Sequence, residues 1–210
     1  MTAIKNLNSF QSRPVRVRLA EIDDAERIAT VINCAFRHSE EFFVDGDRVD
    51  VAKVLKLLNT GKFLLAESEG LLLGCVYVEP RPFLVDEEAT AAPDCVPDQF
   101  GKEDSDLSTE FRNPPSEIRD RKLSRAYLGL LAVDPAHQQS GLGSRLMDAG
   151  EDYCCGLGAS VIDLIVVSLR EELFGFYRRR GYIETGTSPF PAEIATKQPC
   201  HFIEMSKPLC

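Results

Sequence analysis

The chain has 210 residues, 44% of them hydrophobic and 27% charged, which is the composition of a globular protein whose core needs no metal or disulfide to hold it. Its 24 basic and 33 acidic residues give a net charge of −9 without a basic stripe, so nucleic-acid binding is not indicated. No apolar stretch approaches the ~18 residues that cross a bilayer, and the first residues lack the apolar core of a secretion signal.

Cysteine and histidine usage points to a reducing compartment. The seven cysteines are odd in number, no pair has C-x-x-C spacing, and the three histidines are not at ligand spacing. We therefore expect free thiols, no metal site, and a protein of the cytoplasm or the nucleus.

The first third of the chain reads as a strand, two helices and a hairpin. Residues 1–12 are polar and are expected to form a disordered leader to a single domain over 13–210. Alternation over 14–19 predicts a strand, and Asp23 with Glu26 suggests a capping pair for a helix that reaches Phe36. A second helix is predicted from Val51 to about Gly61, and strands over 62–67 and 71–78 read as a hairpin.

Residues 80–124 break the pattern with six prolines and an acidic cluster. Nine acidic residues and one basic residue lie between Asp86 and Glu110, so most of the net charge belongs to this segment. Loops of this length are either solvated excursions or functional flaps, and both interpretations stay open.

Regular structure resumes with strand, helix, strand, helix and two closing strands. A buried strand is predicted over 125–133, with Gly129 as the host of a bulge. A helix follows from Gly141 to Gly156, and a nearly continuous apolar strand covers 159–167. Ser168 and Glu171 suggest a capping pair for a helix that Gly181 ends, and strands are expected at 182–185 and 201–205.

This order predicts an α/β (α+β) fold with a mixed, mostly antiparallel sheet. The strand-helix-strand unit from Leu128 to Val167 requires a parallel pair, whereas the flanking hairpins require antiparallel pairs. Helices should cover both faces of the sheet.

The most informative motif lies between a buried strand and a helix. It reads Gln138-Gln139-Ser140-Gly141-Leu142-Gly143, and its two glycines let the backbone turn tightly beside a ligand. A helix start carries N–H groups without partners and a partial positive charge, so it binds phosphate without a lysine. No Walker string occurs, Leu146 stands where a dinucleotide fingerprint needs glycine, and a plain strand-helix turn is the remaining alternative.

Two ordered blocks resemble the GNAT superfamily of N-acetyltransferases. The first is Leu131-Ala132-Val133-Asp134-Pro135 followed by the glycine turn, and the second is Phe176-Tyr177-Arg178-Arg179-Arg180-Gly181-Tyr182. The resemblance covers residues 15–80 and 125–207 and implies a GNAT-like fold with a splayed parallel strand pair. Arg170 departs from the family pattern, which often has Asn at that position.

The resemblance implies acetyl-CoA as the cofactor and acetyl transfer to an amine of a small molecule or an exposed peptide. Its pyrophosphate would lie on the turn, and its pantetheine arm along the preceding strand. The implied cofactor-binding residues are Leu131, Ala132, Val133, Gln138, Gln139, Ser140, Gly141, Leu142, Gly143, Ser144 and Phe174.

Tyr177 matches the family's general acid, which would protonate the departing thiolate. A base is also required, because an amine of pKa ~10.4 is mostly ammonium at neutral pH. The candidates are Glu40, Glu41 and Glu79, with a water chain as the alternative.

Two further hypotheses use the same fold without catalysis. One is a coenzyme A-binding sensor, and the other is an interaction domain that uses the acidic insert. We expect a monomer or homodimer with no nucleic-acid or membrane partner.

Overall fold

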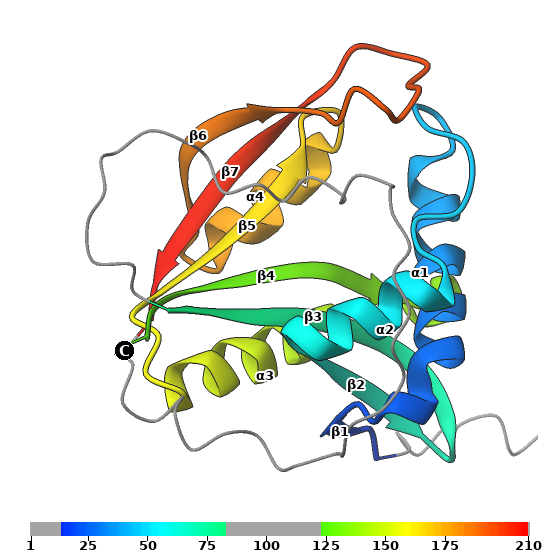
Figure 1. The fold of residues 1–210 in the computed structure, drawn as a ribbon, viewed down its shortest axis with the longest axis vertical. Helices are drawn as coiled ribbons and strands as arrows, with labels where there is room; N and C mark the ends of the chain where they lie inside the picture. The colour runs from blue at the N-terminus through cyan, green and yellow to red at the C-terminus, as the bar shows by residue number, and fades with distance from the viewer. Residues whose placement is uncertain (1–13, 83–122, 210) are drawn as a thin grey trace, which may run out of the picture. The chain divides into compact units, whose positions relative to one another are not determined.

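The computed structural model describes residues 14–82 and 123–209 (Figure 1). The expected leader at 1–12, and the acidic insert apart from its ends, lie outside the described residues. At those ends the two flanking strands run further into the insert than predicted, to Pro82 and from Leu123.

The described residues form the elements that the hydrophobic patterns predicted, in the predicted order. Figure 1 colours them along the chain as follows: β1 Arg16–Leu19, η1 Ile22–Asp24, α1 Ala25–Glu40, α2 Val51–Thr60, β2 Lys62–Ser68, β3 Leu71–Pro82, β4 Leu123–Val133, η3 Pro135–His137, α3 Leu142–Gly156, β5 Val161–Val167, α4 Glu171–Arg179, β6 Ile183–Pro189 and β7 His201–Pro208.

The strands form one sheet of seven in the order β1-β2-β3-β4-β5-β7-β6. β1 pairs antiparallel with β2, and β7 pairs antiparallel with both β5 and β6. β4 and β5 are parallel, and their register runs from Arg125↔Val161 to Tyr127↔Asp163, although β4 continues to Val133. The mixed sheet with a short parallel ladder confirms the predicted fold class.

The chain divides into two compact units, which are described separately. The first comprises the described parts of Met1–Ser39, Asp47–Tyr77 and Leu130–Gly150. The second comprises Glu40–Gly46, the described parts of Val78–Gly129, and Glu151–Cys210. α1, β3, β4 and α3 contribute residues to both units.

In the first unit, α1 buries one face of its helix. Ala25, Ile28 and Ile32 recur at helical spacing and are at most 4% exposed. α2 begins at Asp50, whose side chain accepts from the N–H of Lys53 at 2.7 Å.

Neither predicted helix cap is the one that the structure shows. At the first helix, the N–H of Glu21 donates to Asp24 (2.9 Å), so the capping contact lies two residues before the predicted one. At α4 the cap residue is Arg170, and no side chain caps it. Ser168 instead accepts the N–H of His201 (3.2 Å), a partner that local sequence does not reveal.

The irregular residue of β4 is Leu130, not Gly129 as predicted. Leu130 has a φ of 47°, the left-handed conformation found at bulges. A Cβ on Gly129 would lie 2.7 Å from the ring of Tyr127, so this glycine makes room for an aromatic side chain.

The cysteines differ in one case from the expected free thiols. Cys34, Cys75, Cys154 and Cys200 are free, whereas Cys155 is in a disulfide. Sequence spacing alone cannot reveal such a pairing, because it does not give the distance between sulfur atoms.

Within the described part of the chain, no helix has the length and apolarity needed to span a membrane.

Candidate active site

The glycine turn lies in the first unit, between β4 and α3. Asp134 begins it by accepting the N–H of Ala136 at 2.8 Å, while its own N–H donates to the carbonyl of Leu73. Gln139 and Gly141 have φ values of 61° and 82°, so the backbone reverses sharply before α3. Glycine is the residue that adopts such a conformation without strain.

The turn presents its main chain to solvent. Residues 136–141 are exposed, while Leu142 is buried and anchors the helix start. Among the described residues, no backbone carbonyl outside the helices accepts a main-chain N–H of residues 138–144. The first N–H groups of the 15-residue helix α3 have no partner within that helix, so its start is suited to binding an anion.

Side chains of the turn stabilise it from within. Gln138 donates to the carbonyl of Val133 at 3.2 Å, and the hydroxyl of Ser140 donates to the carbonyl of His137 at 2.6 Å. Arg145, in the first turn of α3, donates to the carbonyl of Val15 at 2.8 Å. The anion-binding capacity of the turn therefore comes from its backbone and the helix dipole.

Close packing behind β4 fixes the strand expected to hold the pantetheine arm. A Cβ on Gly74 of β3 would lie 2.7 Å from the carbonyl oxygen of Ala132 and 3.1 Å from Leu146. Ala132 is buried, and Leu131 and Val133 are half-buried. The structure thus places the predicted residues 131–133 and 138–144 on one continuous strand-turn-helix segment.

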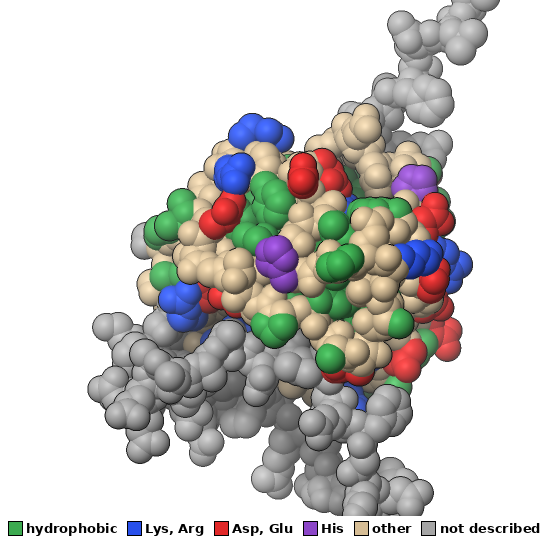
Figure 2. Space-filling view, turned by 90° about the horizontal axis from the view of Figure 1, so that it is seen from above, with side chains coloured by type: hydrophobic (Ala, Val, Ile, Leu, Met, Phe, Trp, Pro, Cys, Tyr) green, Lys and Arg blue, Asp and Glu red, His purple; other side chains and the backbone are tan. Residues whose placement is uncertain are grey.

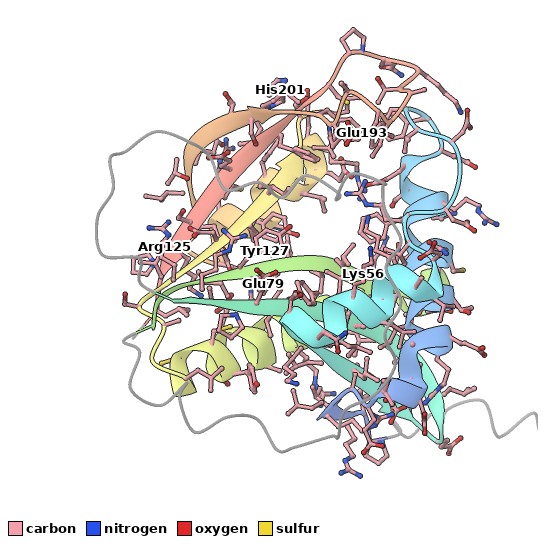
Figure 3. The ribbon with its side chains drawn as sticks, in the orientation of Figure 1. Lys56, Glu79, Arg125, Tyr127, Glu193 and His201 are labelled. Atoms are coloured by element: carbon pink, nitrogen blue, oxygen red, sulfur yellow. The ribbon has the colours of Figure 1, made fainter. Side chains whose placement is uncertain are left out.

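In the second unit, a polar network marks the end where β4 and β5 pair. Arg125 donates to Asp163 at 2.8 and 2.5 Å, and Figure 3 shows it near the start of β4. Ser206 of β7 donates to the same carboxylate at 2.6 Å, and the hydroxyl of Thr185 on β6 lies 3.3 Å from that of Ser206. These contacts join the four strands at the start of the parallel ladder.

Tyr177 lies in α4 of the second unit and is 8% exposed. Its ring packs edge-to-face with Phe176 at 5.2 Å and with Tyr182 at 5.8 Å between centroids. Phe174, predicted to contact the cofactor, is half-buried, and the guanidinium of Arg178 lies 5.9 Å from its ring centroid.

The environment of Tyr177 keeps its hydroxyl protonated. Burial raises the pKa of Tyr177 to about 12, and the guanidinium charges of Arg170 and Arg180 oppose that rise. At neutral pH this phenol is therefore a proton donor and not a base.

The three candidate bases lie in different environments. Glu40 is buried, and its carboxylate lies 3.8 Å from Arg170, which also binds Glu172 at 2.6 Å. Glu41 is exposed, and the ammonium of Lys197 binds its main-chain carbonyl. Glu79 is half-buried on β3, and Figure 3 shows it close to Tyr127 on the neighbouring strand.

The electrostatic partners of Tyr177 are what the sequence least revealed. In the sequence, Arg170 stood out only as a departure from the family pattern, and Arg180 only as a member of the second family block. Glu151, which pairs with Arg180, gave no signal, because a Glu within an amphipathic helix is usually solvated.

Charged side chains are interspersed on the face drawn in Figure 2, where blue and red groups lie beside one another. Within the described residues, no group of three or more His, Cys, Asp or Glu side chains is placed to hold a metal ion.

The fold is an α/β protein with a mixed sheet, and a glycine turn of the kind that can bind phosphate lies at the start of α3. The sequence matches the acetyltransferase (GNAT) family over residues 25–182. The chain belongs to this family, whose cofactor is acetyl-CoA, and the cofactor expected from the sequence is confirmed.

Solved structures agree with this fold. YncA from Salmonella typhimurium, solved with acetyl-CoA, has a TM-score of 0.59 at 17% identity, over 93% of this chain and 94% of its own. A GNAT-family acetyltransferase from Streptococcus pneumoniae has a TM-score of 0.60 at 16% identity, over 94% and 100%. Ribosomal-protein-alanine N-acetyltransferase from Brucella melitensis has 0.59 at 16% identity, over 92% and 99%. No curated protein matches the sequence.

Proposed function

We propose that this protein is an acetyl-CoA-dependent N-acetyltransferase that acts on an amine of a small molecule or an exposed peptide. The observation that carries the proposal is the turn at 138–144, which is exposed over residues 138–141 and leads into the N-terminus of α3. Membership of the acetyltransferase family supports the pyrophosphate of coenzyme A as the ligand of that turn.

The strand-turn-helix segment would bind and orient the cofactor. Residues 138–144 would hold the pyrophosphate through backbone N–H groups, and Leu131, Ala132 and Val133 would offer backbone groups to the pantetheine arm. The register of β4 with β5 ends at Tyr127, so these residues form no ladder with β5. When bound, acetyl-CoA supplies a thioester that an amine can attack directly.

Alignment of two bound reactants supplies much of the rate enhancement in such a reaction. A backbone N–H of β4 would polarise the thioester carbonyl as oxyanion donors do. The hydroxyl of Tyr177 would give a hydrogen bond or a proton to the departing thiolate, whose thiol has a pKa of ~8.5. Because the pKa of Tyr177 is raised, complete transfer of its proton to the thiolate is unfavourable. The positive charges of Arg170 and Arg180 lower that pKa and so favour the transfer.

The base that accepts the amine proton would be Glu40, Glu41, Glu79 or a bound water chain. The pairing of Glu40 with Arg170 indicates a structural role for that carboxylate. Glu41 is exposed and Glu79 is half-buried, and single Gln substitutions at these two positions compare the remaining candidates directly.

Two measurements test the proposal. Calorimetry should show coenzyme A binding to the full chain, and thiol release from acetyl-CoA should depend on an added amine. Binding without release by any amine of a broad panel would favour a non-catalytic coenzyme A sensor. If coenzyme A does not bind at all, the proposed role of the turn is wrong.

A further inference from the structure

Three donors from separate parts of the chain converge on one buried carboxylate in the second unit. Glu151 of α3 is 8% exposed. Its carboxylate accepts from the ammonium of Lys207 at 2.5 Å, the hydroxyl of Tyr182 at 3.1 Å and the guanidinium of Arg180 at 3.4 Å. A buried charge is tolerated only when it is paired in this way.

Two of these donors adjoin Tyr177. The main-chain N–H groups of Arg180 and Tyr182 both donate to the carbonyl of Tyr177, at 3.0 and 3.1 Å. The ring of Tyr182 packs edge-to-face on that of Tyr177 at 5.8 Å, and the guanidinium of Arg180 lies 5.9 Å from the ring centroid of Phe176. Glu151 therefore binds the side chains of both residues whose backbones hold Tyr177.

The charges in this cluster act on the two neighbouring phenols in opposite directions. Arg180 is one of the two guanidinium groups that oppose the raised pKa of Tyr177. Without Glu151 that guanidinium would lose one of the groups that hold it in place, and its effect on the phenol would weaken. The phenol of Tyr182 stays protonated beside Glu151, because burial and the carboxylate raise its pKa.

We propose that Glu151 is a positioning residue of the transfer reaction. By holding Arg180 and Tyr182, it keeps the hydroxyl of Tyr177 in the place and the electrostatic field that proton donation requires. This inference rests on the proposed function, in which Tyr177 is the donor. Glu151 touches neither reactant, and it acts only through Tyr177.

The test is a double-mutant cycle with the full chain, read by thiol release from acetyl-CoA. Glu151→Gln should lower kcat about tenfold, with the KM for acetyl-CoA within about twofold of wild type. In a Tyr177→Phe background the same substitution should change kcat by less than about twofold, because there is no hydroxyl left to position.

A matched control uses the other ion pair at the end of α4. Arg178 and Glu184 pair at the surface, with side chains 61% and 44% exposed. Glu184→Gln should leave kcat unchanged within about twofold, since exposed pairs contribute little. Should Glu151→Gln fail to fold, Tyr182→Phe removes one hydroxyl and keeps the ring contact, and the same cycle applies to it.

The outcomes are distinct. An equal loss of kcat in both backgrounds would show that Glu151 only holds the fold, and would overturn the inference while leaving the proposed function intact. No thiol release by the wild-type protein with any amine would overturn the proposed function itself. A loss confined to the background that retains Tyr177 supports both.

Discussion

Replacing Asp24 with Asn removes a buried charge that organises the start of the first unit. The Asp24 side chain is 8% exposed and accepts from Arg18 at 2.7 and 2.8 Å and from Arg27 at 3.1 Å. Arg18 also forms two bonds to Glu67 of β2, at 2.8 and 2.9 Å. One guanidinium therefore joins β1, β2 and the turn before α1.

The size of the effect follows from the titration of Asp24. Its hydrogen bonds with Arg18 are the main reason that its pKa falls from 3.8 to about 2. A fall of about 1.8 pH units corresponds to about 2 kcal/mol of folding free energy. Because the folded pKa is lower than the unfolded one, this stabilisation is complete above about pH 4 and is lost as the pH falls through about 2.

Urea unfolding of wild type and Asp24→Asn across this range measures the effect. The variant should be less stable by about 2 kcal/mol at pH 7, and the difference should shrink as the pH approaches the folded pKa of Asp24. Asp23→Asn changes an exposed neighbour and serves as the control, with a small difference at every pH. A gap for Asp24→Asn that is as large in acid as at neutral pH would refute the electrostatic explanation.

Three further predictions concern the site itself. Tyr177→Phe should lower turnover at least about tenfold with little change in coenzyme A affinity, and unchanged turnover would exclude Tyr177 as the donor. Gly74→Ala should destabilise the fold by about 1–3 kcal/mol in thermal or urea unfolding, because the added Cβ would meet the backbone of Ala132. Gly156→Ala is the control and should not destabilise the fold, because its Cβ would meet nothing within 4 Å. Gly141→Ala forces a Cβ into a left-handed turn at about 1–2 kcal/mol, so calorimetry should show coenzyme A binding weakened by up to about tenfold. Gly143→Ala, at ordinary contact distance from Val133, should weaken it less.

Local sequence patterns were sufficient to predict the strands, the α-helices and the glycine turn. Periodic hydrophobic patterns indicated the four α-helices among the described residues and β1, and the strand β5 followed from a continuous apolar run, because burial of one face or of both is what such patterns encode. The glycine turn at 138–144 was predictable for a similar reason, since strand, turn and helix are consecutive in sequence. The roles of Tyr177 and of the three candidate bases stay predictions.

Contacts between distant segments were beyond the sequence. Ser168 looked like a helix cap, but its hydroxyl is taken by the N–H of His201, which is far along the chain. Gly129 looked like a bulge residue, but the ring of Tyr127 occupies the space where its Cβ would be, and the strained φ falls on Leu130. In both cases the residue type suits the predicted role, but a residue that is close in space determines the conformation or contact that forms.

The burial of three carboxylates was likewise not predictable from the sequence. Among the described residues, Asp24, Glu40 and Glu151 are the buried acidic side chains, and each lies near an arginine from another element. Aspartate and glutamate are rarely buried, so a sequence reading places all three at the surface. Arginine suits these positions because its planar fork can bind two partners at once, as Arg18 does. The net charge of −9 gives no sign of these three buried carboxylates, and a substitution at any of them leaves an arginine without one of its partners.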